Sequence, residues 1–303
     1  MRSYNNISAE NLVTRYVNNY GLNRDSISID MILKHWELEK ALTKQLLAST
    51  PLNRKTVFYE AYNTLYNELP WLVKTGTASD GNSTKVYTTR WLSLLNDVKG
   101  KHIYEIGSGN GQLITFLADQ GGICTGTEIS ENRPNKHPHP NLEWHETDGV
   151  NLIKYESEAS YDFVISDQLI EHLHPDDIGI HFKNACQLLK SSGKYIFYTP
   201  HYYKGPGDVS LVFGTLEAEG MHLKEYKFHE IFKLLKAAGF TKIYMPVNLK
   251  TNTKMLSAIG IKGFLLLEKS LSVFKNIRLR KRIYHRLIKP FHISDELVII
   301  AQK

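Results

Sequence analysis

The chain has 303 residues, of which 42% are hydrophobic and 22% charged, and these proportions exclude an intrinsically disordered or fibrous protein. The net charge of +6 is modest, and the first residues lack the apolar stretch of a signal peptide. No apolar run approaches the roughly 20 residues of a membrane-spanning helix, and two cysteines are too few for a disulfide framework, so we expect a cytoplasmic protein.

The first hundred residues have the apolar spacing of helices. Side chains four apart recur in three runs, which are Leu12, Tyr16 and Tyr20, then Ile32 and Trp36, then Leu38, Leu42 and Leu46. Ser8 and Thr50, the latter just ahead of a proline, are candidate helix starts, and residues 76–83 form a polar loop. We expect residues 1–98 to form an N-terminal helical region that covers the cofactor or the substrate.

From Lys101 onward, short β-rich runs alternate with helical segments. The predicted strands are residues 102–106, 123–127, 142–145, 163–166, 194–199 and 242–245, and a final run at 297–301 would add an edge strand. The predicted helices are residues 112–119, 168–173, 177–190 and 227–238. This alternation predicts an α/β fold with a mostly parallel sheet and helices on both faces, in a second domain that spans residues 99–303.

A glycine-rich turn lies between the first predicted strand and the helix that follows it. Its sequence is Ile103-Tyr104-Glu105-Ile106-Gly107-Ser108-Gly109-Asn110-Gly111-Gln112-Leu113. Glycines let a ligand approach the main chain closely, and the helix behind them offers free N–H groups. The dinucleotide fingerprint needs its third glycine where this chain has Gln112, and it does not explain Glu105. The spacing therefore argues against a nicotinamide or flavin dinucleotide.

Two acidic residues follow the next two strands. Glu128 ends the second strand, where a carboxylate can accept hydrogen bonds from both hydroxyls of a ribose. Asp148 follows the third strand, where a carboxylate can meet the exocyclic amine of an adenine. Together with the glycine turn, these residues indicate a site for an adenosine-containing ligand.

These segments resemble motif I of the Rossmann-like (class I) S-adenosylmethionine-dependent methyltransferases. The run YDFVISDQLIEHL at residues 161–173 and the run MHLKEY at 221–226 are similar to the ubiquinone-biosynthesis O-methyltransferases and the type 11 methyltransferase group. The resemblance covers about residues 101–245 and implies a Rossmann-like fold with S-adenosyl-L-methionine as cofactor. It also implies the cofactor-binding residues, which are Glu105, Gly107, Ser108, Gly109, Gly111, Glu128, Ile129, Asp148, Gly149, Asp167 and Gln168.

Two features depart from the family pattern. A proline-rich loop at residues 132–140 replaces the usual helix between the second and third strands. The quinone enzymes hold a metal with a glutamate three residues before their Glu-His pair, where this chain has Gln168, a much poorer ligand. We therefore expect no metal, and we expect His137 and His139 to belong to a surface loop and not to a metal site.

Two histidines are candidate general bases for methyl transfer to a hydroxyl group. His172 follows the fourth strand, at the sheet edge where ligands bind in open α/β folds. An unperturbed histidine pKa of roughly 6.5 suits proton abstraction. His201 follows the fifth strand and is the second candidate, and His222 could position the substrate. Each of the three could instead be structural.

The acceptor pocket should be walled by the N-terminal helices, Tyr202, Tyr203 and the loop at residues 205–208. Aromatic walls suit both sugars and quinone rings. The loop and the HLKEY run resemble methyltransferases of bacterial polysaccharide pathways, so O-methylation of a sugar or glycan hydroxyl is our first expectation. O-methylation of a quinone or polyphenol lipid precursor is the alternative, and a cofactor-binding scaffold without turnover is a third hypothesis.

Basic residues are concentrated near the C-terminus. Residues 250–290 contain eleven lysines and arginines and a single acid, a net charge of +10, so the remaining chain carries −4. Residues 263–288 predict a basic amphipathic helix, within an insertion at about 248–294 that interrupts the last two strands. Three roles of this helix remain possible from the sequence. It could be a solvated helical cap, a peripheral contact with the inner face of a membrane, or a site for a polyanionic glycan partner. We expect no nucleic acid, because no RNA-binding module is visible, and the sequence does not indicate the oligomeric state.

Overall fold

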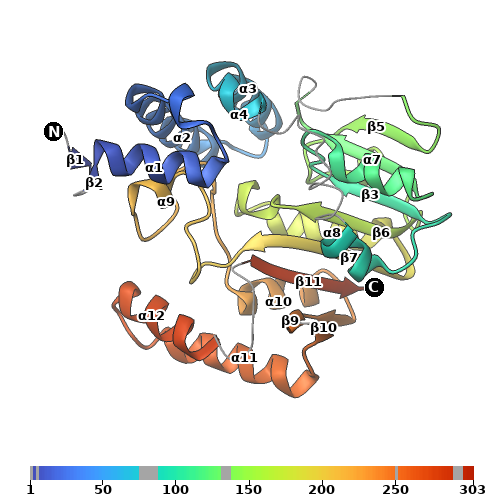
Figure 1. The fold of residues 1–303 in the computed structure, drawn as a ribbon. Coiled ribbons are helices and arrows are strands. Elements are labelled where there is room, and N and C mark those ends of the chain that lie inside the picture. The colour runs from blue at the N-terminus through green and yellow to red at the C-terminus, as the bar shows by residue number, and fades with distance from the viewer. Residues whose placement is uncertain (1–2, 5–6, 75–87, 131–137, 250–251, 289–295) are drawn as a thin grey trace.

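The computed structural model describes residues 3–4, 7–74, 88–130, 138–249, 252–288 and 296–303. A central sheet is flanked by helices, with the N-terminal helices at one end of the molecule and the last two helices at the other (Figure 1). The predicted polar loop at residues 76–83 lies outside the described residues.

The sheet has seven strands in the order β5-β4-β3-β6-β7-β11-β8. The strands are β3 (His102–Ile106), β4 (Ile123–Glu128), β5 (Leu142–Glu146), β6 (Tyr161–Asp167), β7 (Leu189–Pro200), β8 (Lys242–Tyr244) and β11 (Glu296–Gln302). The first five strands in that order pair in parallel, and β11 is antiparallel to both of its neighbours. The mostly parallel α/β fold is therefore confirmed. The strand order reverses at β3, which creates the crevice where open α/β sheets bind ligands.

The position of the last strand corrects our prediction of an edge strand. β11 lies inside the sheet, where Ile300 is opposite both Ile196 of β7 and Tyr244 of β8. All five residues from Leu297 to Ala301 are buried. A strand that is buried on both faces reads as a continuous apolar run and is typical of a sheet interior.

Helices cover both faces of the sheet because alternate strand residues point to opposite sides. Ile103 and Ile165 pack with α7 (Gln112–Asp119) in one hydrophobic cluster. Tyr104 and Ile106 pack in a second cluster with three helices, which are α8 (Ile178–Leu188), α10 (Phe228–Ala237) and α11 (Ala258–Leu271). The predicted helix at 168–173 is only a short 3-10 turn, η5 (Ile170–His172), because Gln168 adopts a left-handed φ of 55°.

The N-terminal region is helical. Its main elements are α1 (Ala9–Tyr20), α2 (Ile29–Ala48), α3 (Arg54–Glu68) and α4 (Pro70–Lys74). Ser8 caps α1 as predicted, since its hydroxyl accepts a hydrogen bond from the Asn11 amide at 3.3 Å. The prediction that Thr50 begins a helix is wrong, because residues 51–53 form a turn in which Asn53 Oδ1 accepts from the Thr50 amide.

The remaining elements are short. They are β1 (Ser3–Tyr4), β2 (Ile7–Ser8), η1 (Arg24–Ser26), the π-helical turn η3 (Thr88–Leu92), α6 (Ser93–Leu95), η4 (Leu152–Lys154), α9 (Ser210–Phe213), β9 (Pro246–Leu249) and β10 (Asn252–Met255). The strands β9 and β10 pair as an antiparallel hairpin just after β8.

The single basic helix predicted at residues 263–288 is in fact two helices, α11 and α12 (Ile277–Ile288). The break falls at residues 272–276, and Asn276 caps the second helix by accepting a hydrogen bond from the Leu279 amide at 3.2 Å. Both helices lie between β8 and β11 in the chain, as an excursion from paired strands. Within the described residues, no helix combines the length and apolarity that crossing a bilayer requires.

Candidate active site

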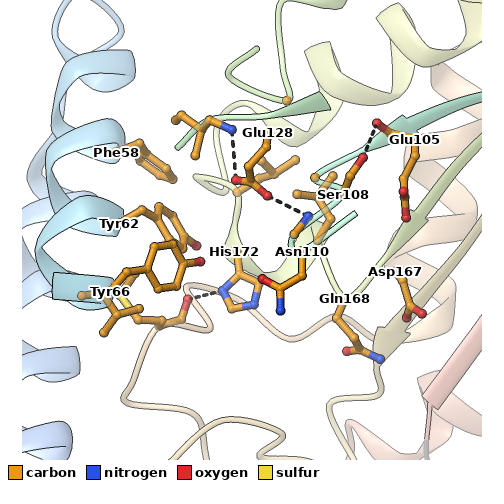
Figure 2. Close-up of a pocket in the computed structure, with 18 of the residues that line it drawn as sticks. Phe58, Tyr62, Tyr66, Glu105, Ser108, Asn110, Glu128, Asp167, Gln168 and His172 are labelled. Carbon is orange, nitrogen blue, oxygen red and sulfur yellow. Dashed lines mark hydrogen bonds between the residues drawn. The ribbon is translucent and has the colours of Figure 1, made fainter. Parts of the chain in front are cut away.

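A cavity of about 650 Å³ lies at the carboxyl ends of the parallel strands, between the sheet and the helix α3 (Figure 2). Its lining divides into two sides. The strand side holds Glu105, Gly107, Ser108, Gly109, Asn110, Gln112, Leu113, Glu128, Ile129, Thr147, Asp148, Gly149, Asp167, Gln168 and Leu169. The other side holds Tyr20, Glu39, Phe58, Tyr62, Leu65, Tyr66, Leu72, His172, Leu173 and Met221.

The glycine turn is a backbone cradle that no other residue type fits. Gly107, Gly109 and Gly111 have φ values of 70°, 55° and 76°, in the left-handed region. A Cβ atom at Gly111 would lie 2.5 Å from the ring of Trp144, and one at Gly107 would lie 2.8 Å from Leu169. Gly107 and Gly111 therefore let the turn pack closely on its neighbours, and Gly107 and Gly109 line the cavity while Gly111 does not.

Glu128 is bound to the same turn. Its Oε2 atom accepts a hydrogen bond from the Gly109 amide at 2.9 Å, and its Oε1 atom accepts from the Ile129 amide at 3.0 Å. Each carboxylate oxygen can accept more than one hydrogen bond, so the group can still take donors from a ligand. The backbone thus fixes the orientation of a carboxylate on the cavity wall (Figure 2).

Glu105 is a buried carboxyl group beneath the cradle. It is 2% exposed, and its Oε2 atom has no hydrogen-bond partner among the described residues. Burial raises the pKa of Glu105 to about 8, and a hydrogen bond with Ser108 only partly opposes the shift. An acid that lines a cavity with an unsatisfied oxygen is suited to a cationic or hydrogen-donating ligand.

Asp148 and Gly149 lie at the end of the cavity beyond β5. The Asp148 carboxylate accepts hydrogen bonds from the Val150 amide at 2.9 Å and from the Asn151 amide at 2.7 Å. Gly149 has a φ of 71°. The local turn therefore already holds the carboxylate, which retains acceptor capacity toward the cavity.

Asp167 and Gln168 end β6 on the opposite side of the glycine turn. Asp167 Oδ1 accepts a hydrogen bond from Arg90 at 2.9 Å, and the same guanidinium group pairs with Glu296 at 2.9 Å. Burial raises the pKa of Asp167, and the charge of Arg90 opposes this shift. Gln168 donates to Glu296 at 2.6 Å. Sequence reasoning missed Arg90, because only the tertiary fold brings this residue of η3 to the site.

His172 lies at the boundary between the two sides of the cavity. Its Nδ1 atom is 3.0 Å from the backbone carbonyl of Met221, and a carbonyl oxygen can only accept, so Nδ1 carries the hydrogen. The Nε2 atom is the ring nitrogen that remains for a proton from a ligand. The ring faces Tyr62 of α3 with a centroid separation of 6.3 Å. This geometry suits a general base.

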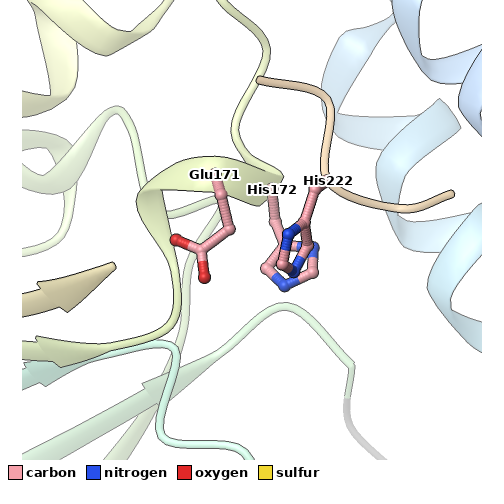
Figure 3. Close-up of side chains that lie close together, drawn as sticks. All are labelled: Glu171, His172 and His222. Atoms are coloured by element: carbon pink, nitrogen blue, oxygen red, sulfur yellow. The ribbon is translucent and has the colours of Figure 1, made fainter. Parts of the chain in front are cut away.

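His222 and Glu171 adjoin His172 (Figure 3). Burial disfavours the charged form of His222, but its hydrogen bond to Glu225 at 2.9 Å and the charges of Glu171 and Asp208 outweigh burial and raise its pKa to about 9. Burial raises the pKa of Glu171 to about 7, and the charge of His222 opposes the shift. A histidine that stays protonated at neutral pH is a poor general base, which favours His172 for that role.

The same three residues could hold a metal ion. Their ligand atoms all lie within 4.8 Å of one another, and Glu171 Oε1 has no partner among the described residues. This grouping could not be predicted from the residues next to the Glu-His pair. Gln168 occupies the position expected of a third ligand, whereas His222 comes from a segment 50 residues later. His139 pairs with Asp119 at 3.3 Å, and His137 lies outside the described residues.

The structure argues against His201 as a catalytic base. Its side chain is 1% exposed and does not line the cavity. Its Nε2 atom is 2.5 Å from Glu268, and the ring stacks on Tyr284 with centroids 4.5 Å apart. The helices α11 and α12 enclose His201 through Glu268 and Tyr284, away from the cavity.

The expected wall is formed by the N-terminal helices, as predicted, but not by Tyr202, Tyr203 or the loop at residues 205–208. Tyr202 and Tyr203 do not line the cavity, because they pack toward α12, with Tyr203 5.1 Å from Tyr284 between ring centroids. The wall consists instead of Phe58, Tyr62 and Tyr66 on α3. Their spacing of four places them on one face of the helix, and this stripe was the available sequence signal.

A chain of buried polar groups joins the N-terminal helices to the His222 segment. Tyr16 OH is 2.8 Å from His35, and His35 is 2.7 Å from Glu39. Glu39 lines the cavity and accepts a hydrogen bond from the Met221 amide at 3.1 Å. Hydrogen bonds as well as apolar packing thus attach the helical region to the side of the cavity opposite the strands.

Comparison with known proteins places the central segment in a family. Residues 104–197 match the family model described as methyltransferase domain. This segment contains the glycine turn, Glu128, Asp148 and His172, so the match confirms the resemblance stated from the sequence.

Similar curated proteins include two ubiquinone biosynthesis O-methyltransferases. The one from Coxiella burnetii is 30% identical over 108 residues, which cover 34% of this chain and 44% of that protein. The one from Paracidovorax citrulli is 24% identical over 153 residues, which cover 48% of this chain and 62% of that protein. The chain therefore spans about half the length of the curated relatives it matches.

Similar solved structures include an S-adenosylmethionine-dependent methyltransferase from Archaeoglobus fulgidus, with a TM-score of 0.49 and 17% identity over 73% of this chain and 94% of that chain. Another is the 1,6-didemethyltoxoflavin-N1-methyltransferase of Burkholderia thailandensis with bound S-adenosylhomocysteine. Its TM-score is 0.48 and its identity 15%, over 84% of this chain and 91% of that chain.

Proposed function

Since residues 104–197 form a methyltransferase domain, we propose that this protein transfers a methyl group from S-adenosyl-L-methionine to a hydroxyl group of a small molecule. One observation carries the proposal: a single cavity joins the glycine cradle, Glu128 and the buried Glu105 to a histidine whose Nδ1 atom is held by the Met221 carbonyl.

The residues on the strand side fit the proposed cofactor. The glycine turn packs closely on Leu169 and Trp144 because Gly107 and Gly111 lack Cβ atoms, and the backbone at Gly107 and Gly109 would face the nucleoside. Glu128 would accept hydrogen bonds from a ribose, and Asp148 would accept one from an adenine amine. The buried Glu105, whose Oε2 atom has no hydrogen-bond partner among the described residues, would suit the positive charge of the donor. We keep Ser108, Ile129, Gly149, Asp167 and Gln168 as proposed contacts, since all five line the cavity.

The bound cofactor supplies an electrophilic methyl group, and the protein supplies alignment and proton removal. His172 would accept the acceptor's proton at Nε2, while its Nδ1–H bond to Met221 holds the ring in place. His222, held protonated by Glu225, would stabilise the negative charge that develops on the acceptor oxygen.

We further propose that residues 1–98 act as a lid on a methyltransferase domain of residues 99–303. Phe58, Tyr62 and Tyr66 of α3 line the cavity on the side that faces Glu128 and His172 (Figure 2). A closed lid excludes water, which otherwise competes for the reactive methyl group. The contact between Glu39 and the Met221 amide would keep the lid in register with the catalytic histidines.

An aromatic hydroxyl is the acceptor that we favour, as in a quinone or polyphenol precursor. The side opposite the strands presents four aromatic rings together with Leu65 and Leu72, and its polar groups are Glu39, His172 and the tyrosine hydroxyls. The names of the curated relatives point the same way. A sugar or glycan hydroxyl, our first expectation from the sequence, becomes the rival hypothesis for the test.

The test supplies methyl-labelled S-adenosylmethionine with either a dihydroxybenzoate or a monosaccharide, and then with lipid and glycan extracts. We expect label in the phenolic or lipid fraction, and label in the sugar fraction alone would establish the rival. Calorimetry with S-adenosylhomocysteine should detect binding that Glu128→Ala weakens roughly 100-fold, because the two proposed hydrogen bonds from the ribose hydroxyls to this carboxylate would be lost. Glu143→Ala, an exposed acid on the neighbouring strand, is the control. Absence of binding in the wild type would refute the proposed function.

A further inference from the structure

The inner faces of α11 and α12 are fully engaged with the body of the protein. Ile261, Phe264 and Leu271 of α11 are buried in the main hydrophobic cluster. Glu268 is completely buried and accepts hydrogen bonds from the Phe228 amide at 3.1 Å and the His229 amide at 2.8 Å. These contacts fix which face of α11 points outward.

The outward face of α11 carries a stripe of exposed large apolar side chains. Ile259 is 84% exposed, Leu266 is 68% exposed and Val273, just past the helix end, is 80% exposed. Their spacing of seven residues is close to two helical turns, so the side chains follow one line along the helix. Exposed apolar side chains in line with basic ones along a helix are the pattern of a helix that lies on a membrane surface.

Cations surround this stripe and continue along the second helix. The exposed ones are Lys262, Lys269, Lys275, Arg278, Arg282 and Arg286. Over residues 252–288 there are nine lysines and arginines and one acid, a net charge of +8, and that acid is the buried Glu268. Every charged side chain that these two helices expose is therefore positive.

We propose that the outer face of α11 and α12 docks on the surface of an anionic lipid bilayer. The lysines and arginines would contact lipid phosphates, while the apolar stripe would enter the boundary between headgroups and acyl chains. A nucleic acid or a polyanionic glycan would match the charge but leave the stripe in water. The two helices lie at the end of the molecule opposite the N-terminal helices, so docking leaves the lid uncovered (Figure 1).

The experiment measures flotation of the whole protein with vesicles of phosphatidylcholine, with or without phosphatidylglycerol. We expect binding only to the anionic vesicles. A triple variant, Lys262→Gln with Lys269→Gln and Lys275→Gln, should bind roughly 100-fold more weakly, since each basic residue near an anionic surface contributes about a fivefold factor. The control triple, Lys44→Gln with Lys99→Gln and Lys183→Gln, changes exposed lysines elsewhere and should bind like the wild type.

A second variant set separates the bilayer from other polyanions. Ile259→Gln with Leu266→Gln and Val273→Gln should weaken vesicle binding but leave any binding to heparin or RNA unchanged. The proposal is overturned if the wild type ignores anionic vesicles, if the control triple loses as much affinity as the test triple, or if the stripe variant binds vesicles like the wild type. The cofactor affinity of every variant should be unaltered, which verifies that each one folds.

Discussion

The two sides of the cavity are built differently. On the strand side, backbone amides and glycines at the ends of β3, β4, β5 and β6 form the surface. On the other side, the surface consists of side chains from α3, η5 and the His222 segment. The first surface is fixed by the sheet itself. The second exists only when segments far apart in sequence have packed together. This difference suggests that changes on the strand side alter cofactor affinity and changes on the other side alter rate or acceptor affinity.

The largest expected effect tests this division at its boundary. His172→Ala should reduce kcat about 1000-fold, because the proton acceptor is lost. The cofactor dissociation constant, measured by calorimetry, should stay the same. His102→Ala removes an exposed histidine at the start of β3 and should have neither effect. A large loss of cofactor affinity in His172→Ala would break the division.

The two buried carboxyl groups allow the sides to be compared by pH. Burial raises the pKa of Glu105 from 4.5 to about 8, so folding favours its protonated form. The resulting stability is present below about pH 4.5 and is lost as the pH rises through about 8, at up to about 1.4 kcal/mol per pH unit. Glu105→Gln should therefore lose less unfolding free energy than the wild type between about pH 5 and pH 8.

Glu171→Gln provides the matched measurement on the other side. The pKa of Glu171 is raised only to about 7, because His222 opposes the effect of burial. This variant should remove less of the pH dependence, as followed by urea unfolding at each pH. An equal or larger effect from Glu171→Gln would contradict the larger upward pKa shift of Glu105.

A smaller effect is expected from a methyl group placed in the cradle. Gly111→Ala would force alanine into a left-handed conformation and move Trp144. We expect cofactor affinity to fall about tenfold, for a cost of about 1–2 kcal/mol. Gly179→Ala places the same methyl group in open space on α8. This control should leave cofactor affinity unchanged and should leave the free energy of unfolding unchanged or slightly raised. Binding of S-adenosylhomocysteine by both variants measures the difference.

The smallest effect should come from the aromatic wall. Tyr62→Leu removes one ring from the acceptor side and should raise the KM for an aromatic acceptor about fivefold, in line with about 1 kcal/mol for a ring contact. Tyr59→Leu changes a residue of α3 that does not line the cavity and should leave the KM unaltered. An unchanged KM in Tyr62→Leu would separate acceptor binding from this wall.

The strand side could be predicted from sequence because its determinants are local. The bounds of β3 and α7 matched the prediction, and the glycine spacing alone argued against a dinucleotide. Glu128 and Asp148 were identifiable because Glu128 ends β4 and Asp148 comes two residues after the end of β5. Whether these residues bind the cofactor stays a prediction.

The other side could not be predicted because its determinants are tertiary. His201 follows β7 as His172 follows β6, yet α11 and α12 enclose the former, and these helices come more than 50 residues later. Tyr202 and Tyr203 do not line the cavity, because they too pack toward α12. Nothing in the sequence near β11 indicates that β8 will occupy the edge of the sheet beside it. The prediction therefore placed β11 at the edge, although it is an interior strand.

The interior position of β11 has a consequence for synthesis on the ribosome. A nascent chain that has emerged as far as β8 cannot add this strand to the sheet, because its neighbour β11 follows only after α11 and α12. Until then β7 keeps an unpaired edge, which is an opening for association between chains. We expect ribosome-stalled chains that lack β11 to be cleaved readily by protease and to recruit chaperones. The sheet can therefore be completed only late in synthesis, when β11 has been made. This strand follows α11 and α12, the helices that we propose dock on the bilayer.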